Sequence, residues 1–507
     1  MTRLPRVRPA AAGAAAAAAV LAALYLLAAR RLPVGVLNDD AANVLLARAL
    51  LHGRFAFPGG LGLPFQFLPG LPLLLVPAVL FGGLRPWLLR AVPLAAGALT
   101  PWLTWRLARR RLGPGASAAA ALLTAANPVL LGLGGLVMPY APYLALSLWL
   151  VDFAPDAESP RAFALLTAAA AFAILLRPHG VVLAAVLALV LWRRFGARRA
   201  ALFLTGAALP SALWLLAGRL AAGPAISDYP SVWRQNVAVL GDPLVQFRHA
   251  VDLLDRLLGA GLFGLPGAPT ALRASLALLV LLAAAAGARR LLRRDEDPRA
   301  FAAAAYLAGV LLLHLTWRWV SLRYLFPLVP FVWILAAAAA EPRLSPRPAA
   351  GAALTALLLA APLRLDLFLA RRGRDARPGY EPRTVAWIRA NVPPDGRLSS
   401  VGAYALALNA GRACEPQDLH PDREWLSRMR AKGVRWVHVR VPLPGDEFAP
   451  ADVPPNFGTA LAAWLTENKL ADEVFAAPDE GTMIFRLKDE TPDRTTKTQR
   501  REVPARR

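Results

Sequence analysis

The chain of 507 residues is strongly apolar and strongly basic. Hydrophobic residues make up 57% of it and charged residues only 18%, whereas soluble globular domains carry about 25% charged residues. This composition excludes an ordinary soluble enzyme, and the single cysteine, Cys414, excludes an internal disulfide. The formal net charge is +24. The arginines stand in short groups between apolar stretches, which indicates a membrane surface and argues against a nucleic-acid partner.

Acidic residues divide the chain into two parts. Residues 1–374 hold 14 of the 33 Asp and Glu residues, and residues 375–507 hold the other 19. We therefore predict an α-helical polytopic membrane domain over 1–374, a soluble α/β domain over 375–488 and a disordered tail over 489–507. The elements expected in the soluble domain are helices at 381–391, 423–432 and 457–468, and strands at 398–401, 434–439, 474–476 and 482–487.

The apolar stretches predict about 11–13 transmembrane helices. They lie at 10–29, 87–107, 116–134, 141–153, 163–176, 181–192, 201–217, 272–287, 301–317, 325–340 and 350–369. The apolar run 71–83 is short for a crossing, so we interpret it as re-entrant, interfacial or half-crossing.

Groups of arginines orient these helices, because basic residues are retained on the cytoplasmic side. The groups predicted to be cytoplasmic lie at 3–8, 106–111, 193–199, 289–294 and 343–347. The opposite, extracytoplasmic face then carries the first loop 30–69, the turn 177–180, the long loop 218–271, the stretch 318–324 and the C-terminal domain. We expect the chemistry on that face.

Two adjacent carboxylates, Asp39 and Asp40, open the first outer loop, and no other acidic residue precedes Asp152. A carboxylate shielded from water at the membrane boundary is suited to accept a proton from a hydroxyl group. Alternatively, one of the two caps an interfacial helix that ends at Gly53, since Asp is a favoured N-cap. The two interpretations are compatible, because one carboxylate can cap while the other reacts.

The turn Arg177-Pro178-His179-Gly180 lies on the same predicted face. A guanidinium there can bind phosphate oxygens with paired donors, or it can simply extend from a helix end to the interface. Arg323 and Tyr324, together with Arg318, allow the same two interpretations. The sequence contains no Gly-rich phosphate loop or nucleotide fingerprint, which favours an activated group delivered within the membrane.

Several segments together resemble the GT-C glycosyltransferases, specifically glycosyltransferase family 39 with its aminoarabinose-transferase and protein-mannosyltransferase relatives. The segments are the acidic pair 39–40, the helix 46–53, the Pro-Gly motif 67–75, the basic turn 106–110, the Arg-Pro-x-Gly turn 177–180, the Arg-Tyr-x-x-Pro helix 323–330, and 385–393 with 433–437 in the soluble part. Asp40 stands where the family has Glu, and Met138-Pro139-Tyr140 stands where relatives often have Ser-Glu.

The resemblance implies transfer of a sugar from a polyprenyl-phosphate donor to a lipid, glycan or protein acceptor at the outer face of a bacterial inner membrane, with inversion at the anomeric carbon. It implies Asp39 as general base, with Asp40 orienting the acceptor or capping the helix. The implied donor-phosphate residues are Arg177, His179, Arg323 and Tyr324. The resemblance implies no particular cofactor. A divalent metal stays open, because two adjacent acids alone do not specify one.

Two other classes of protein remain as alternatives. A transporter or flippase of lipid-linked substrates usually has internal repeats and ionisable groups near the membrane midplane. No repeat is visible, and the acids from Asp152 to Asp366 fall in predicted loops or at helix ends. The third class is a receptor or scaffold that binds a partner through its C-terminal domain. Transfer or hydrolysis of a lipid-phosphate sugar by the purified protein separates the enzyme from both.

The arginine pattern predicts that Asp39, His179, Arg323 and Cys414 all lie outside the cytoplasm. A membrane-impermeant thiol reagent applied to intact cells should label engineered cysteines at the first three positions, and Cys414 itself provided that it is exposed. Labelling only from the cytoplasmic side would contradict this topology.

Overall fold

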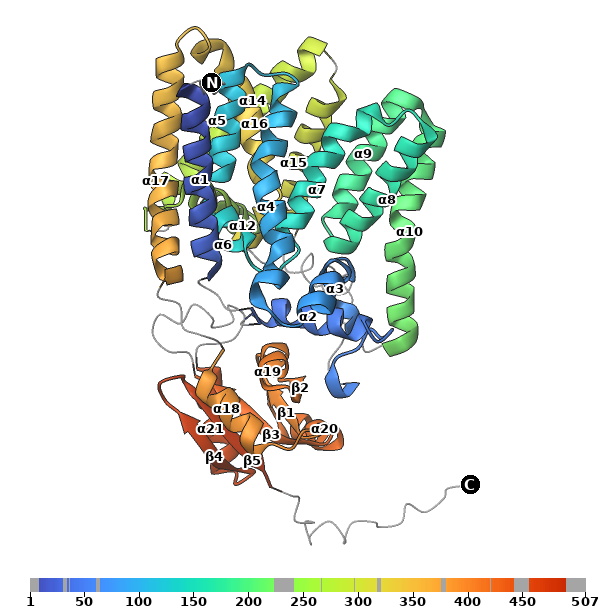
Figure 1. Cartoon of the computed structure of the whole chain (residues 1–507), viewed down its shortest axis with the longest axis vertical. Helices are drawn as coiled ribbons and strands as arrows, with labels where there is room; N and C mark the ends of the chain where they lie inside the picture. Colours follow the sequence, from blue (N-terminus) through green and yellow to red (C-terminus); the bar gives the residue numbers. More distant parts are fainter. Residues whose placement is uncertain are drawn as a thin grey trace, which may run out of the picture. The chain divides into compact units, whose positions relative to one another are not determined.

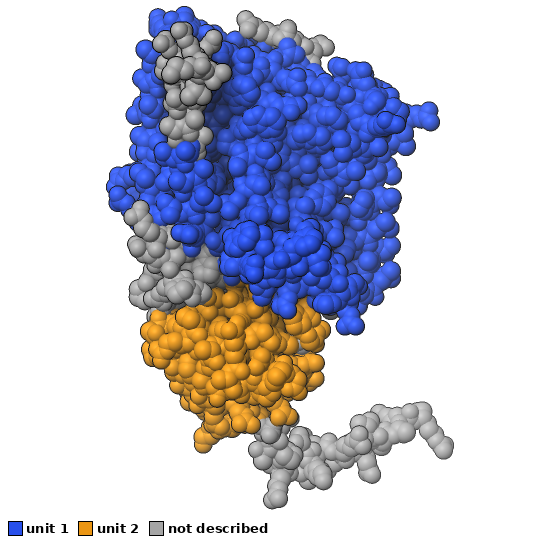
Figure 2. All heavy atoms as spheres, viewed as in Figure 1, with its two compact units in different colours: residues 1–34, 39–56, 63–378 blue, residues 35–38, 57–62, 379–507 orange. Residues whose placement is uncertain are grey.

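The computed structural model describes residues 9–30, 34–35, 37–60, 64–222, 241–265, 267–295, 297–316, 321–374, 380–419, 421–441 and 456–488. The chain forms two compact units (Figure 2). Unit 1 comprises residues 1–34, 39–56 and 63–378, and unit 2 comprises residues 35–38, 57–62 and 379–507. The predicted tail 489–507 lies outside the described residues.

Unit 1 is a bundle of helices (Figure 1). They are α1 (Pro9–Arg30), α2 (Asn38–Leu50), η2 (Pro64–Gln66), α3 (Gly70–Gly82), α4 (Pro86–Arg109), α5 (Pro114–Ala125), α6 (Pro128–Gly134), α7 (Tyr140–Phe153), η3 (Ala154–Asp156), α8 (Pro160–Leu176), α9 (Gly180–Phe195), α10 (Ala197–Ala222), α12 (Pro243–Asp252), η5 (Leu253–Ala260), α13 (Gly261–Phe263), α14 (Thr270–Asp295), α15 (Pro298–Leu315), η6 (Leu322–Tyr324), α16 (Val329–Leu344) and α17 (Pro348–Arg374). Each predicted apolar stretch coincides with a helix, except that 116–134 is divided into α5 and α6.

The division between α5 and α6 has a local cause at Asn127. Its side chain caps α6 by accepting hydrogen bonds from the amides of Val129 and Leu130 at 3.1 and 3.3 Å, and Pro128 cannot donate the bond that would continue α5. The two helices meet at a bend of 50°.

Fewer helices meet a strict criterion for crossing a membrane than the sequence predicts. By length and composition, four described helices qualify, namely α10, α14, α15 and α17, and α5 with α6 would make a fifth. Several others are shorter, such as α9 with 16 residues, and α4 has two prolines in its interior, Pro93 and Pro101, and the buried Arg90. Short and polar-interrupted helices such as these can be accommodated in a multi-helix bundle, where neighbouring helices satisfy their polar groups.

The short apolar run after the first loop forms α3, which has 13 residues. Such a helix is about 20 Å long, less than the hydrocarbon thickness of about 30 Å. In Figure 1, α2 and α3 lie together at one end of unit 1, across the direction of the long helices. This placement agrees with the prediction that the segment does not cross as a regular span.

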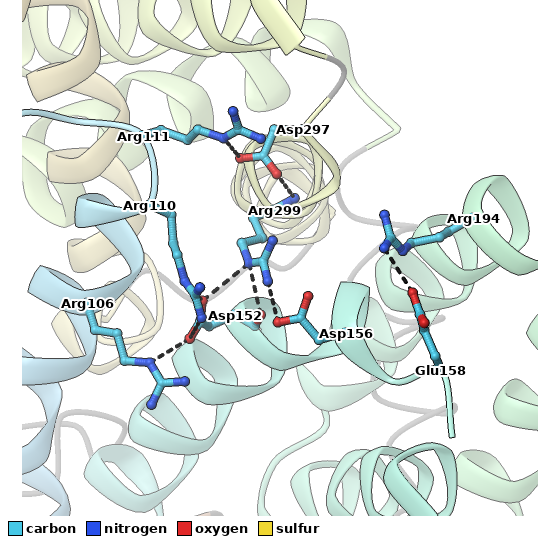
Figure 3. A network of polar contacts seen from close by, with 9 residues as sticks. All are labelled: Arg106, Arg110, Arg111, Asp152, Asp156, Glu158, Arg194, Asp297 and Arg299. Carbon is cyan, nitrogen blue, oxygen red and sulfur yellow. Dashed lines mark hydrogen bonds and ion pairs between the residues drawn. The ribbon is translucent and has the colours of Figure 1, made fainter. Parts of the chain in front are cut away.

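An ionic network joins the other ends of α4 and α7 (Figure 3). The carboxylate of Asp152 is 3% exposed and accepts from Arg106 at 2.8 Å and from Arg110 at 3.0 Å. Arg299 contacts the same carboxylate at 3.3 Å and reaches Asp156 at 2.5 Å. One buried carboxylate therefore contacts three guanidinium groups, two from the C-terminal end of α4 and one from the start of α15.

The same end of unit 1 gathers further ion pairs. They are Arg111 with Asp297 at 2.8 Å, Arg194 with Glu158 at 3.2 Å, and Arg290 with Glu341 at 3.2 Å. Members of the arginine groups predicted to be cytoplasmic thus converge in the fold. The side of the membrane on which they lie stays a prediction.

Unit 2 is built on a five-stranded sheet with strand order β2-β1-β3-β5-β4. Its elements are η1 (Pro58–Gly60), α18 (Pro382–Asn391), β1 (Arg397–Ser400), α19 (Ala403–Ala410), β2 (Ala413–Pro416), α20 (Arg423–Ala431), β3 (Val434–Arg440), α21 (Phe457–Glu467), β4 (Ala471–Ala477) and β5 (Thr482–Leu487). β1 pairs in parallel with β2 and β3, whereas β5 is antiparallel to β3 and β4. The α/β prediction is confirmed, but α19 and β2 were not expected, because both are short and carry no clear periodicity.

The core of unit 2 includes the buried side chains of Trp425, Val437, Leu461 and Phe485, drawn from α20, β3, α21 and β5. Beside it, His438 is 1% exposed and contacts Ser400 Oγ through Nδ1 at 2.9 Å.

The same imidazole contacts Glu381 through Nε2 at 3.0 Å. Arg440 contacts the other oxygen of that carboxylate at 3.3 Å. Because these groups bind one another inside the domain, we interpret them as a structural connection between β1, β3 and the start of α18.

Unit 2 incorporates two pieces of the first loop. Asn38 accepts a hydrogen bond from the Tyr404 amide at 2.8 Å, and the carbonyl oxygen of Gly35 accepts one from Asn409 at 2.9 Å. Phe57 stacks on Tyr404 with ring centroids 4.2 Å apart. The first loop is therefore part of the α/β unit as well as the lead into α2.

Cys414 is 4% exposed in β2, and burial raises the pKa of its thiol well above the usual range. It cannot serve as a native topology reporter. A cysteine introduced at the exposed His52, in a Cys414→Ser background, is the suitable replacement.

We expect Asp152→Asn to lower the free energy of unfolding by about 1–3 kcal/mol, because three guanidinium groups lose their shared counter-charge while remaining partly hydrated. Thermal unfolding in detergent measures this. The matched control is Glu158→Gln, since Glu158 is 67% exposed in its pair with Arg194, and this change should cost less than about 0.5 kcal/mol. Equal losses of stability in Asp152→Asn and Glu158→Gln would contradict the role of Asp152 as the shared counter-charge of three arginines.

Candidate functional site in the helical unit

The two acids of the first loop lie in the first turn of α2 but occupy different surroundings. The side chain of Asp39 is 47% exposed. Asp40 is 1% exposed, and its Oδ1 accepts the amide of Ala41 at 2.8 Å. Asp40 also interacts electrostatically with Arg90 of α4, which is 8% exposed. Asp40 is thus part of the interior, whereas Asp39 is available to a ligand. The protein itself shields the Asp39 side chain only in part.

Arg323 lies beside Asp39, with Nη1 3.5 Å from Oδ2. Its guanidinium also lies over the ring of Tyr324, 5.4 Å from the centroid. Both residues belong to η6, which precedes α16. Arg318 lies outside the described residues. The first turn of α2 and η6 therefore meet at this point.

The predicted turn between α8 and α9 buries Arg177, which is 6% exposed. Its guanidinium lies over the ring of Tyr140 at 4.6 Å. Within the described part of the chain, Nη1 has no hydrogen-bond partner. A side chain reaching out to the interface would be exposed, so the structure supports the inward-facing alternative.

Two glycines make this turn possible. A Cβ on Gly180 would lie 2.6 Å from the amide nitrogen of Ile174, and one on Gly70 would lie 2.6 Å from the backbone of Leu175. No side chain fits at either position without displacing backbone. These close approaches pack the start of α3 and the start of α9 against the end of α8, immediately before Arg177.

Three histidines gather next to Arg177, although they are far apart in the sequence. His179 Nε2 and His314 Nε2 are 3.3 Å apart. His314 stacks on Tyr324 with centroids 5.0 Å apart, and His249 contacts the backbone carbonyl of His314 through Nε2 at 2.8 Å. All three side chains are at most 7% exposed. The sequence analysis did not identify His249 or His314 as site residues.

Tyr140, also missed, completes the arrangement. Its ring lies under the Arg177 guanidinium, and its hydroxyl interacts electrostatically with Arg323, Arg177 and Asp39. A continuous set of contacts thus runs from Asp39 through Arg323 and Tyr140 to Arg177. The site combines an exposed carboxylate with two guanidinium groups, which suits proton abstraction beside a bound anion.

A metal site is a separate question. Among the described residues, no three His, Cys, Asp or Glu side chains are grouped so that they could hold a metal ion.

Comparisons with known proteins identify a matching family model and similar solved structures. A family model described as dolichyl-phosphate-mannose-protein mannosyltransferase matches residues 73–218. ArnT from Cupriavidus metallidurans, in a structure bound to undecaprenyl phosphate, aligns with a TM-score of 0.61 at 13% identity, covering 94% of this chain and 98% of that one. No curated protein sequence matches the chain.

The oligosaccharyltransferase of Archaeoglobus fulgidus is also similar in structure. Its complex with zinc and sulfate aligns with a TM-score of 0.54 at 15% identity, covering 92% of this chain and 72% of that one. A form of the same protein tethered to an acceptor peptide gives 0.54 at 13% identity, covering 93% and 74%.

These structural likenesses show the fold, which is that of the GT-C glycosyltransferases. Together with the family match, the fold indicates that the chain is a multi-pass membrane glycosyltransferase.

Proposed function

We propose that the protein transfers a sugar from a polyprenyl-phosphate donor to an acceptor hydroxyl, with Asp39 as general base. The observation that carries this proposal is the placement of the exposed Asp39 carboxylate 3.5 Å from Arg323. It is supported by the buried Arg177, whose Nη1 has no partner among the described residues. A buried donor of this kind costs free energy unless a ligand satisfies it.

In the proposed reaction, Asp39 takes the proton of the acceptor hydroxyl as its oxygen attacks the anomeric carbon. The bond from that carbon to the phosphate oxygen breaks, and its electron pair stays on the phosphate. Attack from the face opposite the leaving group inverts the configuration. Arg177 and Arg323 balance the charge that develops on the phosphate, where partial exclusion of water strengthens their effect.

The other predicted residues take supporting roles. His179 and Tyr324 line the phosphate side of the site, next to Arg177 and Arg323 respectively. Asp40, which is buried, holds the start of α2 and does not react. The ArnT structure with undecaprenyl phosphate supports a polyprenyl phosphate as the lipid. A lipid, glycan or protein acceptor at the extracytoplasmic face of a bacterial inner membrane completes the proposal.

A transporter or flippase is the alternative, and Asp366 bears on it. The sequence suggested that this acid lies at a helix end, but it lies within α17 and is 0% exposed. Its two carboxylate oxygens have no hydrogen-bond partner within the described structure. A buried ionisable group within a membrane helix can mark the pathway of a transported substrate or ion. Reconstituted vesicles separate the two functions, since a glycosyltransferase forms product and a flippase only moves lipid.

Asp39→Asn should reduce the transfer rate by about 10²–10⁴-fold, because the amide cannot accept the proton. The thermal unfolding midpoint should change little, since Asn preserves the size of the side chain and Asp39 is half-exposed. Asp40→Asn is the matched control. It should retain more activity and lose more thermal stability, because Asp40 is buried near Arg90.

Near-full turnover in Asp39→Asn would exclude Asp39 as the base. Loss of activity that only follows loss of the folded protein would do the same, so both quantities are measured on one detergent preparation.

Arg177→Ala should lower kcat/KM for the lipid-phosphate donor by a factor equivalent to several kcal/mol, because a buried anion would lose its counter-charge. Arg177→Lys should restore part of the activity if charge alone is needed, and little if two parallel hydrogen bonds are needed. Arg198→Ala, on an exposed position of α10, is the control. Wild-type donor kinetics in both Arg177→Ala and Arg323→Ala would refute this phosphate site.

A further inference from the structure

One side of α4 stays exposed through the second half of the helix. Leu99, Trp102, Trp105 and Arg109 are exposed. They follow one another at intervals of three or four residues, so they lie on the same side of the helix. The positions on the other side are buried in the bundle, namely Thr100, Leu103, Thr104, Leu107 and Ala108.

The chemistry of this exposed side changes in one direction along the helix. It starts with Leu99, continues with the indole rings of Trp102 and Trp105, and ends with Arg106 and Arg109 in the last turn. The ten-residue step from Leu99 to Arg109 is about 15 Å long. This is half of the hydrocarbon thickness of about 30 Å. The order of apolar, aromatic and cationic groups therefore matches one leaflet, from acyl chain through interface to headgroup.

Contacts within the protein hold the two arginines at the end of this side. The guanidinium of Arg106 lies 5.6 Å from the centroid of the Trp102 ring and contacts Asp152 at 2.8 Å. Arg109 donates through Nη1 to the carbonyl oxygen of Leu112 at 2.9 Å. Two positive charges are thus fixed beside the tryptophans, where an approaching headgroup would not have to order free side chains.

The surrounding ionic network keeps a positive charge (Figure 3). Its arginines share the three carboxylates of Asp152, Asp156 and Asp297. The guanidinium groups at this end are those of Arg106, Arg109, Arg110, Arg111 and Arg299. Among these eight groups, five positive charges face three negative ones, so an excess of two positive charges remains. An anionic ligand complements this excess, whereas a neutral one does not.

We infer that this side of α4 binds an anionic phospholipid. We call it the α4 lipid face and define it by Leu99, Trp102, Trp105, Arg106 and Arg109. The acyl chains lie along Leu99 and the two indole rings, and the lipid phosphate lies at the two arginines. The inference is independent of the reaction proposed for Asp39, because it concerns the other end of unit 1.

A second copy of the chain fits the α4 lipid face less well. In a two-fold contact the same patch lies on both subunits. Arg106 and Arg109 of the two copies would then approach each other, and like charges at close range repel. A phospholipid with a negative headgroup brings the opposite charge to the same place.

The test is native mass spectrometry of the full-length protein in detergent. Phosphatidylglycerol is compared with phosphatidylcholine of the same acyl chains, and the affinity for the first bound lipid is measured. An arginine near an anionic lipid surface contributes about fivefold to affinity. With two arginines, the wild type should prefer phosphatidylglycerol by roughly ten- to thirtyfold.

Three variants locate the binding site. Arg109→Gln should lower the affinity for phosphatidylglycerol about fivefold and leave that for phosphatidylcholine unchanged. Arg109→Lys should retain most of the affinity, because it keeps the charge. Arg198→Gln is the matched control, since it removes the same charge from an exposed position of α10 and should match the wild type.

Trp105→Ala should weaken binding of both lipids by the same factor, because it removes apolar contact and no charge. Trp105 is exposed, so this substitution leaves the packed side of α4 intact.

Three results would overturn the inference. The first is equal affinity of the wild type for the two lipids. The second is an equal loss of affinity in Arg109→Gln and Arg198→Gln, since diffuse surface charge would then explain the binding. The third is a dimer that Arg109→Gln or Trp105→Ala dissociates, because the α4 lipid face would then be covered by a second copy.

Discussion

Burial of the Arg177 guanidinium is the constraint on which the arrangement of the site depends. A charged group in an apolar bundle is costly unless something faces it. Here the ring of Tyr140 faces it at 4.6 Å. The sharp turn that directs the side chain inward requires the close backbone approaches at Gly70 and Gly180. The short helix α3 and the helices α8 and α9 are therefore positioned by the same few residues that position the charge.

Arg177 and the arginines at the opposite end of unit 1 differ in how their charge is compensated. At one end, Asp152 and Asp297 accept from surrounding guanidinium groups, and the charges are largely compensated within the protein (Figure 3). At the other end, Arg177 is accompanied by tyrosines and histidines, and one of its nitrogens has no partner among the described residues. Compensated arginines fix helices relative to one another. The other arrangement provides a cationic environment for an anion that the protein does not itself contain.

The sequence predicted the elements better than their contacts. Apolar composition located the helices, and the arginine pattern assigned the loop 30–69, the turn 177–180 and the stretch 318–324 to one face. Asp39, His179 and Arg323, one from each of these segments, lie near one another in unit 1. His249 and His314 were missed because only the packing of the helices brings them close to His179. His314, for example, is 135 positions away from His179 in the sequence. The exposure of Asp39 was also beyond prediction, since it depends on how α2 lies across the bundle. In unit 2, α19 and β2 are too short for periodicity to reveal.

The inclusion of residues 35–38 and 57–62 in unit 2 has a consequence for biosynthesis. Asn38 and its partner Tyr404 are separated by 366 positions. At roughly 5–20 residues per second, the ribosome needs on the order of 20–70 s to supply the second after the first. During that interval the ring of Phe57 and the backbone of Gly35 lack their native partners, which lie in α19. A chain that terminates before residue 379 lacks α19, so residues 35–38 and 57–62 have no native partners to pack against. A defect late in translation therefore leaves a segment near the N-terminus without its native contacts.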